Sequence, residues 1–339
     1  MLPFHSASPD PSTRPEAMSP DCLDARHRMS RHRFASIAAV MLLVLSAAAC
    51  GADSPGEATI AGEAGPGDVT SETPAAGTLE SSPKRFNLAL FDADSANVDN
   101  EWFPQVPGTR YVWEGKAFED DGQRVERRDV YTVTDLTKVV GGVRAVVGWD
   151  RDYNDGELGE SELVFFAQDR YGTVWHLGEY VEHYSEGEFE GGRLWTVGDP
   201  EGTKAGIAMK PDPQPGTPSY SQGFAPPPWF WNDRSRVSDI GVRDCVPVDC
   251  FDNALVIEEF EPRFKGAYQL KYYAQGVGNI RVGWRGSNEE EQESMVLTDF
   301  FRLSPEALDA TRAEALAMEH RATAYARMPP AEQRGEESP

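Results

Sequence analysis

Four cysteines offer the most specific chemistry in the sequence, and three of them invite a chemical interpretation. Cys50 follows an apolar stretch and three alanines, residues 47–49. This arrangement resembles a bacterial lipobox, in which the cysteine receives diacylglycerol through a thioether, although residue 47 is alanine where that pattern usually has leucine. The same alanines also suit ordinary signal peptidase cleavage. Because pairing of Cys245 with Cys250 would leave Cys50 as the odd thiol, we favour its lipidation.

Cys245 and Cys250 flank a short turn. In an oxidising compartment, two cysteines placed around a turn most often form a local disulfide. A redox-active dithiol is less favoured, because the spacing is not C-x-x-C and no strand–helix junction surrounds it. The sequence therefore predicts a structural Cys245–Cys250 disulfide.

Other residues that could perform chemistry carry weaker signals. His176 and His183 lie on either side of an expected turn at Gly178-Glu179, without the spacing of zinc ligands, and we expect both on solvent faces. The 56 acidic residues always allow some pair suited to glycoside hydrolysis, so such pairs are not evidence. No G-x-S-x-G elbow is present. The sequence thus predicts no catalytic residue, no metal site and no cofactor.

Residues 210–231 combine seven prolines with five large aromatic residues. Proline supplies no backbone donor, so this stretch cannot form a central strand and is expected to be a long ordered loop. Its rings either cap the open end of the domain or present a rigid apolar surface to a ligand or protein partner. The candidate contact residues are Tyr220, Phe224, Trp229, Phe230 and Trp231.

The formal net charge of −24 limits the classes of partner. An acidic surface repels the phosphate backbone of nucleic acids, so nucleic-acid binding is not expected. It favours solubility and could attract cations or basic partners.

The N-terminal region has the parts of a secretory signal when it is read from Met29. Basic residues precede the apolar run 37–45, which is shorter than the roughly 20 residues that span a bilayer. We expect residues 1–49 to be a signal peptide, with translation starting at Met29 or Met18. Residues 50–83 would be the lipidated Cys50 and a flexible Gly/Ala/Ser/Pro-rich linker. The domain would then lie outside the cytoplasm, anchored to the envelope membrane by lipid.

Residues 84–303 show the period-two alternation of β-strands. In residues 268–272, for example, Tyr268, Leu270 and Tyr272 form one face and Gln269 and Lys271 the other. No strong helical pattern interrupts the region, so the strands should connect as antiparallel neighbours. The predicted fold is mainly β, either a single antiparallel barrel or a two-sheet sandwich.

Glycine-containing pairs between these runs indicate hairpin turns, among them Gly141-Gly142, Asp155-Gly156 and Gly191-Gly192. After the strands, Ser304 and Pro305 are typical of a helix start, and Pro329-Pro330 of a stop. We expect one C-terminal helix over residues 304–328, whose narrow apolar stripe docks on the domain or meets a partner. Residues 329–339 are expected to be a disordered tail.

Four stretches resemble an uncharacterised family of secreted bacterial β-rich proteins, many of them lipoproteins. They are residues 98–115, opening with Val98-Asp99-Asn100-Glu101-Trp102-Phe103-Pro104, and 165–179, 212–216 and 272–278. The resemblance implies export and a β fold. It implies no activity, ligand or catalytic residue.

These observations lead to one favoured function and two alternatives. The favoured hypothesis is a non-catalytic envelope lipoprotein that binds a small apolar ligand or a protein partner. A structural or interaction lipoprotein with a filled core is the first alternative, and a glycan-active enzyme the second. An apolar cavity inside the sheet would favour ligand binding, whereas dense packing would favour the first alternative.

Overall fold

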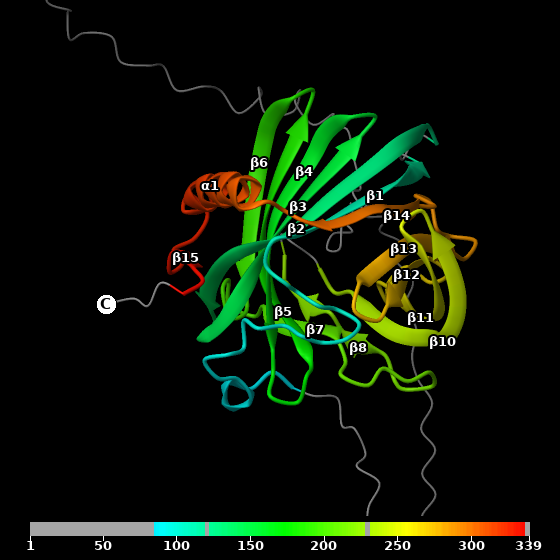
Figure 1. Ribbon diagram of the computed structural model, residues 1–339, viewed down its shortest axis with the longest axis horizontal. Coiled ribbons are helices and arrows are strands. Elements are labelled where there is room, and N and C mark those ends of the chain that lie inside the picture. The colour runs from blue at the N-terminus through cyan, green and yellow to red at the C-terminus, as the bar shows by residue number, and fades with distance from the viewer. Residues whose placement is uncertain (1–84, 119–121, 228–230, 336–339) are drawn as a thin grey trace, which may run out of the picture. The chain divides into compact units, whose positions relative to one another are not determined.

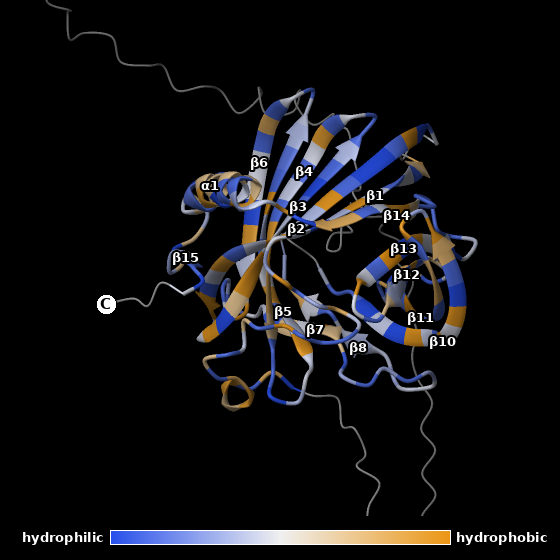
Figure 2. Cartoon of the chain, viewed as in Figure 1, coloured by the Kyte–Doolittle hydropathy of each residue, from blue (hydrophilic) through white to orange (hydrophobic). Residues whose placement is uncertain are grey.

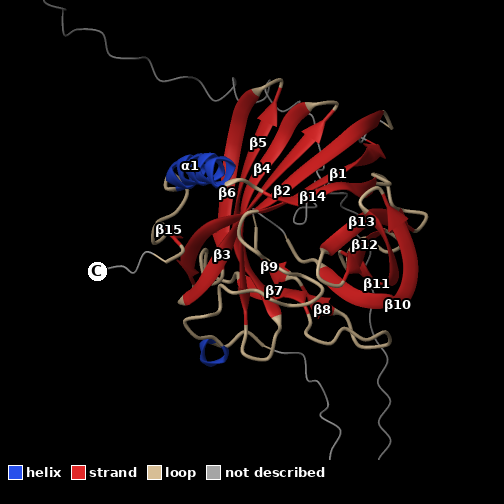
Figure 3. Cartoon of the chain, viewed as in Figure 1, coloured by secondary structure: helices blue, strands red, loops and turns tan. Residues whose placement is uncertain are grey.

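One antiparallel sheet takes up most of the described part of the chain, as Figures 1 and 3 show. The computed structural model describes residues 85–118, 122–227 and 231–335. The predicted signal peptide, Cys50, the linker to residue 83, Trp229 and Phe230 therefore lie outside the described residues. The predicted class, mainly β and antiparallel with one C-terminal α-helix, is confirmed.

The elements begin with a short 3-10 helix, η2 (Leu88–Leu90), and end with the helix α1 (Pro305–Ala322) and a two-residue strand. The strands are β1 (Thr109–Phe118), β2 (Arg124–Val140), β3 (Val143–Asn154), β4 (Glu157–Gln168), β5 (Val174–Ser185), β6 (Glu188–Thr196), β7 (Lys204–Met209), β8 (Tyr220–Ser221), β9 (Gly223–Phe224), β10 (Arg234–Val246), β11 (Asp249–Phe260), β12 (Tyr268–Ala274), β13 (Gly278–Arg285), β14 (Ser294–Arg302) and β15 (Glu332–Gln333).

The two ends of the sheet meet at one short segment of the chain. The hydrogen-bonded order is β8-β10-β11-β12-β13-β14-β1-β2-β3-β4-β5-β7-β9, and β8 and β9 are separated only by Gln222. β8 pairs with β10, whereas β9 pairs with β7. The segment thus bridges both ends, but β8 and β9 do not pair, and the described sheet is not closed into a barrel. Of the two predicted architectures, the open sheet agrees with the sandwich.

Local sequence explains the hairpins that set the register. Asp155 and Gly156 join β3 to β4 with φ of 49° and 86°, the left-handed pair that two-residue hairpins favour. Gly141 and Gly142, at 56° and 84°, join β2 to β3 in the same way. Figure 2 shows the alternation between these turns as bands of hydrophobic and hydrophilic colour along the strands.

The turn predicted at Gly191-Gly192 is wrong, because both residues lie inside β6. The chain turns earlier, at Glu186 and Gly187, which have φ of 53° and 78°. Gly192 allows a close approach instead: a Cβ there would lie 3.1 Å from the ring of Tyr325, whose hydroxyl accepts the Gly192 N–H. A glycine that admits an aromatic ring cannot be distinguished from a turn glycine by composition alone.

Both faces of the sheet are buried along β2 to β5, so each face has its own core. The inner face collects side chains from both ends of the sheet, such as Val146 and Val164 with Leu255 and Ile257. The outer face packs Trp149, Leu163 and Phe165 against the helix. At about 25 cal/mol per Å² of apolar surface buried, these two layers provide most of the folding free energy.

The helix docks on the outer face through Thr311, Ala315, Met318 and Ala322. The Ser304 side chain accepts the Ala307 N–H, as a helix N-cap does. The helix ends at Ala322 rather than near residue 328. Within the described residues, no helix has the length and apolar character needed to cross a membrane.

The segment after the helix differs from the predicted disordered tail over its described part. β15 pairs with β2, with Glu332 opposite Thr137 and Gln333 opposite Leu136. The ammonium group of Lys138, almost fully buried, binds the carboxylate of Glu319 and the carbonyl oxygen of Pro329. The contact with Pro329 holds residues 329–335 against the domain, because withdrawing them would leave the buried Lys138 ammonium group with Glu319 as its one remaining partner among these two.

Candidate functional site

The three described aromatic residues that were proposed for ligand or partner contact lie mainly inside the domain. Tyr220 and Trp231 are each 4% exposed, and Phe224 is half-buried. Trp231 packs against the rings of Trp195 and His176, with centroid distances of 4.8 Å and 5.2 Å. Its Nε1 donates a hydrogen bond to Asp233 at 3.0 Å. The alternative in which the rings of residues 210–231 cap the open end of the domain requires such packing.

A cavity lies on the inner face, beside the segment that bridges the sheet ends. Its volume is about 60 Å³. Aromatic rings form much of the wall, and seven of the lining residues carry a charge, an amide or an imidazole. Those rings are Phe103, Tyr111, Trp113, Tyr131, Phe166 and Tyr273, and the polar groups include Asp129, His176, Gln222, Glu259 and Lys271.

Lys271 is the most unusual of the lining residues. Its side chain projects from β12 to the inner face and is only 3% exposed. Among the described residues, no acceptor makes a direct hydrogen bond or ion pair with its ammonium group, although the charge lowers the pKa values of Asp150 and Glu259 from a distance. A buried ammonium group that faces a cavity without a direct partner requires water or a ligand there.

Two carboxyl groups complete the polar side of the cavity. Glu259 accepts a hydrogen bond of 2.6 Å from the side-chain amide of Gln222, and burial raises its pKa. Asp129 Oδ1 has no hydrogen-bond partner, while the carboxyl group as a whole contacts Asp150. Burial, and then the negative charge of Asp150, raise the pKa of Asp129 well above its ordinary value. Burial thus raises the pKa of both carboxyl groups on this side of the cavity.

A second carboxyl pair lies further along the inner face, between Glu160 and Glu162 of β4. Burial, and then the charge of Glu160, raise the pKa of Glu162 well above its ordinary value. Burial opposes ionisation of Glu160 too, but hydrogen bonds with Glu162 and His183 lower its pKa to about 2. The contact between the two carboxyl groups thus moves their pKa values in opposite directions. In the described part of the chain, no group of three or more acidic, histidine or cysteine side chains is arranged to hold a metal ion.

The expectation that both histidines lie on solvent faces is wrong for His176. Gly178 and Glu179 continue β5 instead of forming a turn, so His176 points inward and is 3% exposed. Its Nε2 lies 3.1 Å from the carbonyl oxygen of Gly178, and burial lowers its pKa to about 4. Glu179 Oε2 is 3.6 Å away, but burial raises the pKa of Glu179 to about 8. The two side chains are neutral near pH 7, so their contact is not an ion pair.

Three of the four stretches that carry the family resemblance contribute to the cavity wall. Phe103, Pro104, Tyr111 and Trp113 come from the first, Phe166 from the second, and Tyr273 and Gly278 from the fourth. The sequence pattern did not point to the polar groups opposite them. Alternation places Lys271 on the face opposite Tyr272, and the structure shows that this face is the buried one.

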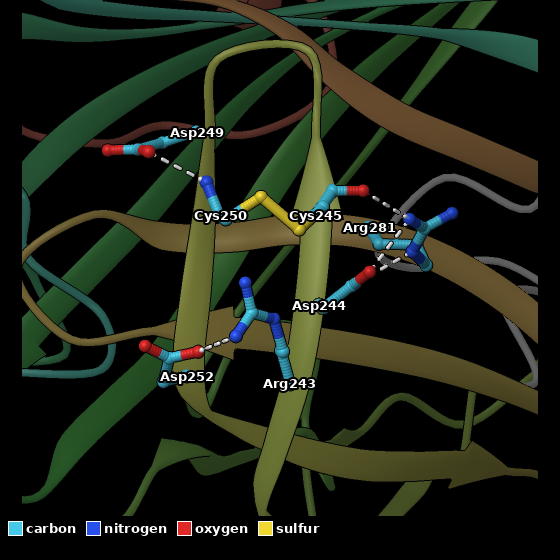
Figure 4. The surroundings of a disulfide bond; sticks show 7 residues. All are labelled: Arg243, Asp244, Cys245, Asp249, Cys250, Asp252 and Arg281. Atoms are coloured by element: carbon cyan, nitrogen blue, oxygen red, sulfur yellow. Dashed lines mark hydrogen bonds and ion pairs between the residues drawn. A yellow bond between two sulfur atoms is a disulfide. The ribbon is translucent and has the colours of Figure 1, made fainter.

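The structure contains the predicted disulfide between Cys245 and Cys250, with sulfurs 2.07 Å apart (Figure 4). The two residues are paired in register at the end of the β10–β11 hairpin. Arg281 binds the carboxylate of Asp244 and the carbonyl oxygen of Cys245, which attaches this exposed hairpin end to β13.

No known protein-family model matches the chain. None of the curated proteins matches it either. Two solved structures resemble it weakly. One is a protein from Bacteroides fragilis NCTC 9343 described as exported and having a YmcC-like fold, with 12% identity and a TM-score of 0.37. The other, from Parabacteroides distasonis ATCC 8503, is described as a lipoprotein, with 15% identity and a TM-score of 0.34. Each comparison covers 60% of this chain and 100% of the other.

Proposed function

We propose that this chain is an exported, lipid-anchored and non-catalytic binding protein that holds a small hydrophilic ligand in its inner cavity. The observation that carries the proposal is the buried ammonium group of Lys271, which faces the cavity without a direct partner among the described residues. Burial without a hydrogen bond costs a charged group several kcal/mol, so an acceptor in the cavity would stabilise the fold considerably.

The cavity wall defines the chemistry of such a ligand. An acceptor oxygen would bind the Lys271 ammonium group, and a donor would reach the carboxyl groups of Asp129 or Glu259. The volume of about 60 Å³ exceeds the roughly 10–15 Å³ that one water needs, but it is far below the roughly 300 Å³ of a typical drug-sized pocket. These properties favour a molecule of few heavy atoms over the apolar ligand expected from sequence.

The arrangement of the inner carboxyl groups supports a non-catalytic role. Asp129 contacts Asp150, and Glu160 contacts Glu162, in pairs enclosed by the sheet. Glycoside hydrolysis requires two carboxyl groups about 5 Å or more apart that flank a substrate cleft. Two acids in direct contact, away from bulk water, do not provide that arrangement.

The binding proposal is tested by releasing small molecules from the full-length protein purified from its host in mild detergent. The variant Lys271→Met removes the ammonium group while keeping an unbranched side chain, and Lys265→Met makes the same change at an exposed position. We expect mass spectrometry of the denatured wild-type and Lys265→Met proteins to reveal the same bound molecule, and its yield to fall about tenfold in Lys271→Met.

Two outcomes would count against the proposal. Equal yields from all three proteins would place the bound molecule elsewhere. If no small molecule is recovered from any of the three proteins, the result would favour the structural lipoprotein with a filled core. Tyr273→Phe, which removes one hydroxyl group from the wall, serves as a second variant if Lys271→Met does not fold.

The lipid anchor depends on Cys50, which lies outside the described residues, and rests on the sequence alone. We expect intact-mass measurement of the membrane-extracted protein to give a mature chain that begins at Cys50 and carries diacylglycerol. A chain that begins at Cys50 without added acyl mass would indicate simple secretion.

A further inference from the structure

A second hollow lies on the outer face of the sheet, across β14, β1, β2 and β3, and its volume is about 370 Å³. We call it the arginine groove. Its floor contains Val112 and Val130, which are paired in register on β1 and β2. Around them lie Arg110, Arg128, Arg151, Tyr153, Asp299 and Phe301.

Strand register brings the three arginines together. Arg110 lies on β1 opposite Phe301, and Arg128 lies on β2 opposite Tyr153. Arg151 follows on β3, next to the valine floor. Arg110 pairs with Thr132, four residues along β2 from Arg128, so at about 3.3 Å per residue and about 4.8 Å between strands these two backbones lie about 14 Å apart. The long side chains of all three arginines nevertheless line the same hollow. Three guanidinium groups therefore converge on a single hollow.

Carboxylates do not neutralise these arginines as they do others on the same face. Among the described residues, no carboxylate lies within ion-pair distance of Arg110 or Arg151, and Arg128 has only Glu114 at 3.7 Å, with both side chains about half exposed. By contrast, Asp135 and Asp309 bind Arg312 of the helix. Burial, and then the charge of Arg151, lower the pKa of Arg110.

Neutral neighbours hold the guanidinium groups in place. Arg110 donates to the hydroxyl groups of Thr132 and Thr311, at 3.0 Å and 3.2 Å. Arg151 lies over the Trp149 ring at 4.1 Å, and its buried Nε has no acceptor. An arginine stacked on a ring keeps its in-plane N–H groups available as donors. The groove thus combines fixed positive charge with at least one unsatisfied donor.

We propose that the arginine groove binds an oxyanion carrying two or more negative charges, borne by a small organic molecule. Three guanidinium groups and the carboxylate of Asp299 give the lining a formal charge of +2, on a chain whose net charge is −24. The forked donors of arginine match phosphate and carboxylate oxygens. Tyr153 and Phe301 would contact the apolar body of the ligand, and the volume lies within the range of small-molecule sites.

Isothermal titration calorimetry of the full-length protein in detergent, at low ionic strength, tests this site with pyrophosphate, citrate and acetate as probes. We expect pyrophosphate or citrate to bind and acetate, with one charge, not to bind. Binding of pyrophosphate alone would assign a phosphorylated ligand, and binding of both would assign a polycarboxylate or phosphorylated one through their shared charge. Arg151→Gln should weaken binding about tenfold or more, because it removes charge-assisted hydrogen bonds.

The matched control is Arg243→Gln, which makes the same charge change at an exposed position paired with Asp252. It should leave the affinity within about twofold of wild type, because a distant surface charge is screened. Equal weakening by both variants would show diffuse attraction and overturn the proposal. Absence of binding to either multivalent probe at millimolar concentration would overturn it as well. Arg110→Gln is informative only if its melting temperature is unchanged, since Arg110 also contacts the helix.

Discussion

Replacing Trp231 by alanine should lower the free energy of unfolding of the domain. The ring of Trp231 fills the space beside the segment that bridges the sheet ends. Trp231 is 4% exposed and packs on Trp195 and His176. A Cβ on Gly223 would lie 2.0 Å from its ring, so this backbone approaches the indole as closely as packing allows. Without the indole, β9 would lose the surface against which it packs.

The expected magnitude has two parts. Removing a buried tryptophan costs about 3–5 kcal/mol through lost burial and the cavity that remains. The indole N–H also binds Asp233, whose loss of a partner adds about 1 kcal/mol or more. For a domain of this size, each kcal/mol lowers the melting temperature by about 2–4 °C. We therefore expect a fall on the order of 10 °C.

Circular dichroism during thermal and urea unfolding measures this loss. Trp284→Ala is the matched control, because Trp284 is 38% exposed and its removal should cost less than about 1 kcal/mol. Trp231→Phe, which keeps a ring but not the donor, should lie between wild type and Trp231→Ala. If Trp231→Ala and Trp284→Ala shift the melting temperature equally, the capping role of Trp231 is refuted.

Three further predictions concern pH, the disulfide and the helix. Burial raises the pKa of Glu179 to about 8 from an ordinary 4.5, so its stabilising neutral form is lost as the pH rises through 8. The melting temperature should fall between about pH 5 and pH 8 and level off above that, and Glu179→Gln should reduce the slope; an unchanged slope would contradict the assignment. Replacing both Cys245 and Cys250 by serine should cost at most about 2 kcal/mol in urea unfolding, because the closed loop is short and already paired as a hairpin. A larger loss would mean that the bond restrains more than this hairpin. Glu319→Gln should lower stability by about 3 kcal/mol, since it leaves the buried Lys138 ammonium group without its carboxylate. A change below about 1 kcal/mol, measured by thermal unfolding, would show that the carbonyl of Pro329 suffices.

Short-range chemistry in the sequence was enough to predict much of the fold. The hairpin at Asp155-Gly156, the cap at Ser304 and the pairing of Cys245 with Cys250 each depend on residues a few positions apart. Such local rules do not require knowledge of which elements face each other. The features that these rules predict are therefore found in the structure almost unchanged.

The inner face could not be predicted in the same way. Alternation identifies the two faces of β12 but not which is buried, and a lysine is normally assigned to solvent. Lys271 points inward, where its charge lowers the pKa values of Asp150 and Glu259, which come from strands far apart in sequence. Likewise, Gly178 stays within β5 because a Cβ there would meet the backbone of Trp195 at 2.4 Å. The first outcome depends on strands distant in sequence, and the second on how closely β5 and β6 approach each other.

A high-resolution crystal structure of the full-length protein, purified from its host without refolding, tests the central claim most directly. We predict electron density inside the cavity for a small molecule with an oxygen atom within about 3 Å of Lys271 Nζ and a donor near Asp129 or Glu259. Density for an apolar chain, or a cavity that contains only water, would contradict the proposal that this protein binds a small hydrophilic ligand.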